Sequence, residues 1–306
     1  MNKLEKALFE KLTDLHQVPS GAFNLRKNGE SEERVSTKEI EIIPKKDKNG
    51  IDVIIKPNVI GKSVHIPVII TVGGLTDLVY NDFYIGENSD VVIVAGCGIH
   101  NKTCKTSIHN GIHSFHLEKN CKVRYIERHV GEGNGTGGKI LNPVTKIVMK
   151  DGSQMLMETT QLGGVTSTDR KTKAKLGDGA RLTIQENLLT TNEQTAKTIF
   201  DVDLSGENSS VEVVSHSVAR DNSIQEFKSN IIGKNKCFGH VECDGILLDN
   251  AKIKSLPMVD AQHNEASLTH EAAIGKIAGE QLTKLMTLGL GEKEAEDVII
   301  QGFLLG

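Results

Sequence analysis

The densest group of side chains that could bind a metal or carry a nucleophile lies near the C-terminus. Its members are Cys237, His240, Glu242, Cys243, Asp244, His263, His270 and Glu271. If the run 237–244 is an extended strand, its two cysteines project to one face, and His240 and Glu242 project to the other. No C-x-x-C pair is present, so the spacing does not predict a closed zinc site. On this chemistry alone we favour the interpretation of Cys243 as a small buried apolar residue.

A second group of histidines and cysteines lies in the first half of the chain. It contains Cys97, His100, Cys104, His109, His113 and His116. His113 and His116 have helical spacing and could act as metal ligands. They fall, however, in a run that alternates like a β-strand. We therefore favour an interpretation of this group without a metal.

A glycine cluster matches two nucleotide-binding patterns in part. Gly133 to Lys139 satisfies G-x-x-x-x-G-K, and the same stretch contains G-x-G-x-x-G. Ile140 follows where a phosphate-binding loop needs Ser or Thr for magnesium, and the next residues have strand character instead of starting a helix. We interpret the cluster as a loop between structural repeats.

Six short sequence repeats make up the part of the chain that holds most of these candidate ligands. Each has a turn built on Asn or Gly, followed by a run in which apolar and polar residues alternate. The turn residues recur every 27 to 32 residues, at Asn88, Asn120, Gly152, Gly179, Asn208 and Asn235. A repeat of this length must stack on its neighbours to bury its apolar face. We predict a mainly β fold, a right-handed parallel β-helix over 64–258; an antiparallel β-sandwich or barrel is the alternative.

Helical periodicity replaces the strand period at both ends of the chain. The first segment, 1–63, is predicted to be helical and irregular, with one amphipathic helix built on Leu4, Leu8, Leu12 and Leu15. The last segment, 259–306, is predicted to form two helices, over 266–288 and 292–304. Such a pair could cap the solenoid or dock a partner.

Composition excludes several classes of protein. The 306 residues carry a net charge of −4, which argues against a general nucleic-acid surface. No apolar run approaches the roughly 20 residues needed to cross a bilayer. The charged start, Met1 to Lys6, lacks the apolar region of a signal peptide. We expect a cytoplasmic protein whose five cysteines are reduced thiols.

The C-terminal third resembles a known family. The elements that carry the resemblance are Cys243-Asp244-Gly245-Ile246-Leu247, His270-Glu271-Ala272 and Gly302-Phe303, with Gly96-Cys97 and His113-Ser114 upstream. In order and spacing they resemble the SufB/SufD family, the scaffolds of the SUF iron–sulfur cluster assembly system. The resemblance runs from about Val91 to the C-terminus. The N-terminal part is shorter than in typical members, so the chain resembles a minimal version.

The resemblance implies a fold, partners and a cargo. It implies a β-helix flanked by helices, acting as a non-enzymatic scaffold with a SufC-like ABC ATPase. It also implies a homodimer through the β-helix, a transient iron–sulfur cluster, an iron source and a sulfur donor of the cysteine desulfurase system. It implies neither nucleic acid nor a membrane span. Flavin binding is associated with complexes of the family, although no residue of this chain marks a flavin site.

The same resemblance assigns roles to individual residues. Cys243 matches the family's sulfur-accepting cysteine, Glu271 the glutamate of the H-E-A motif, and His270 a functionally important histidine. Further candidates are Cys97, Cys237 and His240. The expected ATPase-docking residues are Ile277, Gln281, Leu285, Val298 and Phe303.

Two features of the chain bear on how far the resemblance extends. One chain carries both the cysteine and the His–Glu pair, which fits a homodimer in place of a SufB–SufD heterodimer. The chain departs from the family at Thr269, where an acidic residue is usual, and it lacks much of the N-terminal sulfur-accepting region.

Two other function classes are the alternatives to a scaffold. A β-helix carbohydrate-active enzyme would need a groove of Asp, Arg and Lys, and no such carboxylates cluster on one predicted strand face. A purely structural binding module would use the C-terminal helices and hold neither iron nor sulfide. We expect the scaffold, and not an enzyme.

Overall fold

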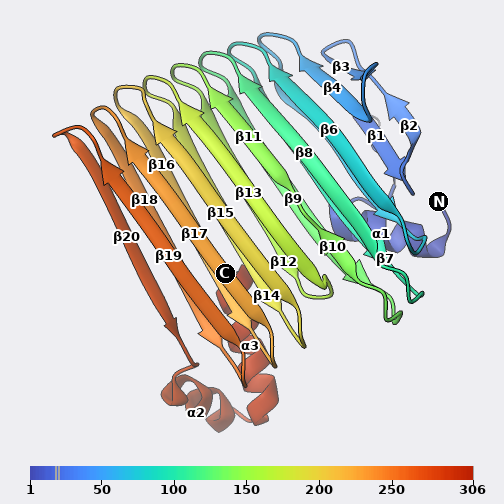
Figure 1. Ribbon diagram of the computed structural model, residues 1–306, viewed down its shortest axis with the longest axis vertical. Helices are drawn as coiled ribbons and strands as arrows, with labels where there is room; N and C mark the ends of the chain where they lie inside the picture. The colour runs from blue at the N-terminus through green and yellow to red at the C-terminus, as the bar shows by residue number, and fades with distance from the viewer. Residues whose placement is uncertain (18, 20, 306) are drawn as a thin grey trace.

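The computed structural model describes residues 1–17, 19 and 21–305, which form a β-solenoid of about eight turns (Figure 1). Its strands form two sheets that face each other. Sheet A contains, in spatial order, β2 (Glu30–Val35), β1 (Ala22–Lys27), β5 (Ile60–Ile70), β7 (Asp90–His100), β9 (Lys122–Glu132), β12 (Gln154–Leu162), β14 (Arg181–Thr190), β16 (Ser209–Ala219), β18 (Cys237–Leu247) and β20 (Ala266–Gly275). Sheet B contains β19 (Lys252–Ala261), β17 (Ile224–Gly233), β15 (Thr195–Leu204), β13 (Ser167–Leu176), β10 (Lys139–Leu141), β8 (Ser107–Leu117), β6 (Thr76–Ile85), β4 (Gly50–Ile55) and β3 (Ile40–Pro44), while β11 (Val144–Met149) also lies between β13 and β8.

Parallel pairing in register runs along most of each sheet. In sheet A, for example, Glu186 pairs with Ser215, and Ser215 pairs with Cys243. Because paired residues of parallel strands point to the same side, inward side chains form rows along the solenoid axis. The predicted parallel β-helix is confirmed, and the sandwich alternative is wrong.

The corners of the coils explain the repeated Asn and Gly. Asn88, Asn120 and Asn208 have φ values of 57°, 56° and 57°, and Gly152 and Gly179 have 67° and 62°. This left-handed backbone is accessible to Asn and Gly at little cost. The corners also stack, because the backbone N–H of Asn88 donates to Lys119 O at 3.1 Å in the next coil. At the sixth predicted corner, the side chain of Asn235 accepts from the Lys236 backbone N–H at 2.9 Å.

The interior of the solenoid has an apolar and a polar part. The apolar part contains stacked aromatic rings, with Phe83 and Phe115 4.5 Å apart between centroids. The polar part contains buried ionisable side chains, including Glu127, Arg170 and Glu186. Such groups are costly to bury unless each one is paired or hydrogen-bonded.

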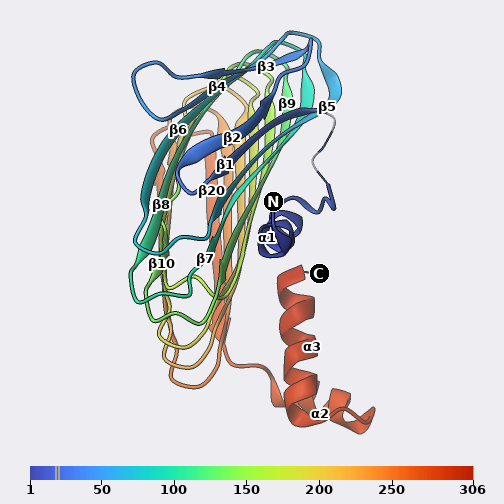
Figure 2. The same cartoon turned by 90° about the vertical axis from the view of Figure 1, so that its right-hand side faces the viewer.

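The three helices of the described residues lie along one outer surface of the solenoid (Figure 2). The side chains of Leu8 and Leu12 in α1 (Lys3–Thr13) lie over Gly98 on the outer face of β7. α2 (Gly279–Thr287) leads into α3 (Glu292–Leu305), which packs on β14 and β16. The C-terminal helices therefore lie beside sheet A, and the expectation that they cap the end of the solenoid is wrong.

The observed element boundaries differ from the predicted ones at both ends. Strands run from Ala22 to Gly275, beyond the predicted limits of 64 and 258. The predicted helix over 266–288 is wrong for its first part, because 266–275 forms β20. The apolar spacing suggested a helix, but β18 offers an in-register partner for each residue of β20. Tertiary pairing therefore overrides the local pattern.

The glycine cluster stacks on the corner of the preceding coil. The backbone N–H of Gly135 donates to Asn101 O at 3.0 Å, and that of Gly137 donates to Thr103 O at 2.9 Å. A Cβ added at Gly135 would lie 2.4 Å from the Thr103 backbone nitrogen. These glycines therefore permit close approach of two backbones, and their N–H groups do not form a phosphate cradle. None of the helices in the described part of the chain is long and apolar enough to span a membrane.

We predict that Gly135→Ala destabilises the protein by about 1–3 kcal/mol, because the added methyl group meets backbone atoms that cannot rotate away. The matched control is Gly302→Ala in α3, where an added Cβ has no neighbour within 4 Å. There we expect stabilisation of about 0.5–1 kcal/mol from the helix preference of alanine. Urea unfolding measures both changes, and equal effects at the two positions would contradict the stacking account.

Candidate functional site

Cys243 is the last buried side chain of its row in sheet A. It lies on the inner face of β18, 2% exposed, with Ser215 of β16 on one side and Ala272 of β20 on the other. Burial raises the pKa of its thiol to about 11, although the nearby Ser255 hydroxyl opposes the shift. The thiol is therefore protonated in the closed coil, and forming the reactive thiolate requires solvent or a positive charge to reach it.

A polar row leads to Cys243 from the interior. Ser215 Oγ donates to Glu186 Oε2 at 2.9 Å, and Thr198 Oγ1 donates to Glu186 Oε1 at 2.9 Å. Burial raises the pKa of Glu186, although Arg170 and these two hydroxyls favour its charged form. Cys243 thus sits where the polar part of the interior meets the end of the solenoid.

The structure places His270 on the same face of sheet A as Cys243 and Glu271 on the opposite face. His270 pairs with Val241, so its side chain lies on the same face of the sheet as Cys243, two residues along the neighbouring strand. Glu271 pairs with Glu242 and shares the outer face with it. Cys243 and His270 therefore form one inward-facing group, while Glu271 stands on the opposite face of the same edge strand.

The further candidates occupy other places. Cys237 is buried on the inner face of β18, but it lies six residues from Cys243, roughly 20 Å along the strand. His240 faces outward, where its Nδ1 lies 2.9 Å from Thr269 Oγ1. Cys97 is buried in β7, in the N-terminal half of the solenoid. The structure does not bring these three to Cys243.

The C-terminal end of the solenoid is open. β19 and β20 are the last strands of their sheets, and no described strand pairs with their outer edges. Apolar side chains at this end are between 37 and 57% exposed: Leu256, Met258, Val259 and Ile274. Unpaired strand edges next to uncovered apolar side chains form a surface that can pair with another chain.

The residues expected to dock the ATPase divide into two groups. Ile277 is buried in the cluster that attaches the C-terminal helices to sheet A, and Phe303 packs against the same cluster. Gln281 and Val298 are exposed, and Leu285 is half-buried. Met286 and Leu288 are also exposed, the latter by 76%. The accessible apolar surface of the helical pair therefore lies on α2, its C-terminal turn and one side of α3.

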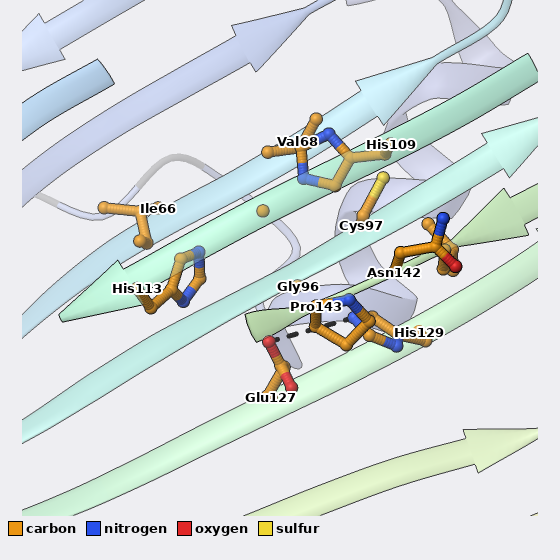
Figure 3. Close-up of a pocket in the computed structure, with 12 residues that line it drawn as sticks. Ile66, Val68, Gly96, Cys97, His109, His113, Glu127, His129, Asn142 and Pro143 are labelled. Carbon is orange, nitrogen blue, oxygen red and sulfur yellow. Dashed lines mark ion pairs between the residues drawn. The ribbon is translucent and has the colours of Figure 1, made fainter. Parts of the chain in front are cut away.

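The second predicted group separates in the structure. Cys97, His109 and His113 line one internal cavity together with Glu127 and His129 (Figure 3). The three remaining members lie elsewhere. His116 stacks on Tyr84 on the outer face of sheet B at 4.9 Å, Cys104 is exposed, and His100 Nδ1 lies 3.7 Å from Glu132 Oε2. The pair that shares a face is thus His109 with His113, and not His113 with His116.

Buried ion pairs surround this cavity, and sequence analysis missed them. Arg26 Nη2 donates to Asp77 Oδ1 at 2.6 Å, and Arg170 Nη1 donates to Glu127 Oε2. Burial alone would raise the pKa of Glu127, but Arg170 holds it well below its ordinary value. The only available signal was charged residues at inward positions of alternating strands, such as Arg170 in Ser167–Leu176.

The described residues contain no set of three His, Cys, Asp or Glu side chains already arranged around one point as metal ligands. Around Cys243, the described part of one subunit supplies one thiol and one imidazole on the inner face. A four-ligand shell for an iron–sulfur cluster therefore needs ligands from outside a single chain.

We predict that acidification weakens the fold through His129, whose pKa burial lowers to about 3 from 6.5. Between these values the unfolded chain binds more protons than the folded one, so stability falls as the pH decreases through this window. From pH 7 to about 4.5 the loss from this residue is roughly 2–3 kcal/mol. His129→Gln, which can still accept from Arg170, should flatten the dependence of unfolding free energy on pH. Equal slopes for the wild type and His129→Gln would contradict the assignment.

The chain is similar in sequence to known proteins. Residues 80–303 match the family model described as the SUF system FeS cluster assembly SufBD core domain. The chain is 29% identical to a SufBD family protein of Methanocaldococcus jannaschii over 288 residues, 89% of this chain and 90% of that one. It is 29% identical to one of Methanothermobacter thermautotrophicus over 221 residues, 71% of this chain. A Staphylococcus aureus SufBD family protein is 26% identical over 224 residues.

The lengths of these relatives differ from that of this chain. The alignment spans 90% of the M. jannaschii protein but only 53% of the M. thermautotrophicus protein and 47% of the S. aureus protein. The matched region, 80–303, contains Cys243, His270 and both C-terminal helices. It covers more than half of this sequence. The chain belongs to the SufBD family of iron–sulfur cluster assembly proteins.

Proposed function

We propose that this protein is a scaffold for SUF-type iron–sulfur cluster assembly that acts as a homodimer with a SufC-like ABC ATPase. The observation that carries the proposal is the position of Cys243. It is the last buried side chain of its row, next to the edge strand β20 and on the same face as His270. Family membership supports the role in assembly.

The ligand chemistry at this end suits a cluster that must be released. A thiolate is the preferred protein ligand for iron in clusters, and an imidazole is a harder ligand. A mixed shell of Cys243 and His270 would hold a cluster less firmly than four thiolates. Glu271 follows His270 on the edge strand β20 and would reach the interface between two subunits from the outer face of the sheet. The cluster is the cargo of the scaffold and not a resident cofactor.

Sulfur would arrive by exchange at Cys243. The thiolate attacks the outer sulfur of a donor persulfide, which forms the Cys243 persulfide and releases the donor thiolate. The burial that raises the thiol pKa must first be relieved. The last coil is suited to this because β20 has a strand partner on one side only. The cysteine desulfurase system would supply the persulfide, and a separate source would supply iron.

Two-fold pairing of the open end would complete the site. A symmetric dimer places the same strand of each copy at the interface. Edge pairing would cover Leu256, Val259 and Ile274 and bring two copies of Cys243 to the same boundary. Two chains then supply two thiolates and two imidazoles, where one chain supplies one of each. The exposed surface formed by α2, its C-terminal turn and one side of α3 remains free to bind the ATPase.

Cys243→Ser should lose most of the iron–sulfur absorption after anaerobic reconstitution, because a hydroxyl is a poor ligand for iron and cannot carry sulfane sulfur. Cys121→Ser is the matched control, since Cys121 is also buried and its Sγ donates to Glu118 O at 3.0 Å, a bond that serine can replace. Iron, acid-labile sulfide and visible absorption are measured for both variants. Undiminished cluster content in Cys243→Ser would reject the assignment.

Val259→Asp should convert the dimer to a monomer, because it places a charge on the inner face of β19 at the open end. Val148→Asp is the control, since Val148 is similarly exposed on the outer face of sheet B, away from this end. Sedimentation velocity gives the mass of each protein. A monomeric wild-type protein, or a dimer that survives Val259→Asp, would contradict association through the open end.

A further inference from the structure

The internal cavity in the N-terminal half of the solenoid is formed by a gap between two histidines. His109, Gly111 and His113 alternate on β8 and all face inward, so the sequence H-x-G-x-H leaves no side chain between the two imidazole rings. A Cβ added at Gly111 would lie 3.2 Å from His109 Nε2 and 3.4 Å from His113 Nε2. Both nitrogens therefore point toward the space above Gly111, and the cavity has room for about one water molecule.

Hydrogen bonds fix the orientation of both rings. His109 Nδ1 donates to Asp77 Oδ2 at 3.0 Å. Tyr125 Oη donates to Glu127 Oε1 at 3.0 Å, so it accepts from His113 Nδ1 at 2.8 Å. In the neutral rings, a proton on each Nδ1 leaves the lone pair of Nε2 directed into the cavity. A carboxylate behind the imidazole, as Asp77 stands behind His109, is a usual outer-shell arrangement of a metal-binding histidine.

Other hydrogen bonds to the cavity histidines leave His109 Nε2 and His113 Nε2 available for a ligand. Asn81 Nδ2 lies 3.4 Å from His113 Nε2, a long and weak hydrogen bond. Arg170 Nη2 donates to His129 Nδ1 at 3.2 Å, which occupies that nitrogen. The thiol of Cys97 lines the same cavity, and Figure 3 shows its sulfur beside the ring of His109. Two nitrogens and one sulfur thus border one small space.

We propose that His109 Nε2, His113 Nε2 and Cys97 Sγ form a binding site for one divalent first-row transition-metal ion. Nitrogen and thiolate ligands select iron, cobalt or zinc over magnesium or calcium. Bonds of about 2.0–2.1 Å to nitrogen require both rings to move closer to the ion. The Cys97 thiol loses its proton to solvent as its sulfur–metal bond forms, so each bound ion releases one proton.

A thiolate ligand lowers the positive charge that the ion would add to this space. The buried side chains around the cavity include Arg26 and Arg170, which are balanced by Asp77 and Glu127. A divalent ion would leave this balance uncompensated if all of its ligands were neutral. The Cys97 thiolate removes one of the two added charges. The fourth coordination position remains open to water, which suits an ion that must exchange.

The strand that covers the cavity is interrupted beside it. β10 ends at Leu141 and β11 begins at Val144, and the intervening Asn142 and Pro143 both line the cavity. Pro143 has no N–H group, so it cannot donate to the neighbouring strand. In the proposed assembly role the physiological ion would be ferrous iron. Metal binding at this site is nevertheless independent of Cys243 and of the dimer.

The test uses Co²⁺ alone and the full-length Cys243→Ser protein, so that the proposed cluster site does not contribute. We expect one Co²⁺ per chain by equilibrium dialysis, a thiolate-to-cobalt charge-transfer band, and release of one proton per ion. His109→Gln and His113→Gln should each weaken binding by more than the 10- to 100-fold typical of losing an outer-shell partner. Cys97→Ser should abolish the charge-transfer band.

Gly111→Ala provides a variant that keeps every ligand. Its methyl group would occupy the space between the two nitrogens, so Co²⁺ binding should be lost while circular dichroism shows a folded protein. The controls are His116→Gln on the outer face of the same strand and Cys121→Ser, and both should bind Co²⁺ like the parent. Absence of Co²⁺ binding by the parent, or binding unchanged by Gly111→Ala and His109→Gln, would overturn the proposal. Either result would leave the role of Cys243 untouched.

Discussion

In-register stacking of parallel strands is the constraint on which this structure depends. Each inward side chain lies against its equivalents in the coils before and after it. The character of one inward residue therefore affects its neighbours along the row. The row that contains Glu127, Thr159, Glu186, Ser215 and Cys243 shows this most clearly. Stacking places a thiol in line with buried carboxylates and hydroxyls that lie far from it in the sequence.

The polar interior carries an energetic cost that an ordinary apolar solenoid would avoid. Arg170 and Glu127 are almost fully buried, and removing one partner of such a pair typically costs about 3–5 kcal/mol. Replacing both by packed apolar residues is often neutral or stabilising. Paired charges, the inward histidines His109, His113 and His129 and the thiol of Cys97 gather around one space. Such a lining fits a chemical role for that space better than a purely structural one.

The repeat spacing and strand alternation favoured the parallel β-helix over a sandwich, because Asn and Gly mark the corners of the coils. They were not sufficient for 266–275, where pairing with β18 decided between helix and strand. The candidate site was predictable in part: C-D and H-E-A led to Cys243 and His270, which share the inner face of sheet A. Alternation would also have placed Glu271 opposite His270 had that segment been recognised as a strand. The Arg26–Asp77 pair could not be predicted, because 51 residues separate two charges that only coil stacking brings together.

The central claim is that a cluster forms between two subunits and needs a thiolate from each. The most direct test is the iron content of a purified mixed dimer with one wild-type subunit and one Cys243→Ser subunit, reconstituted anaerobically. The account predicts that the mixed dimer holds little more iron than the Cys243→Ser homodimer. A mixed dimer with half the iron of the wild type would show that each chain builds its cluster alone and would contradict the account.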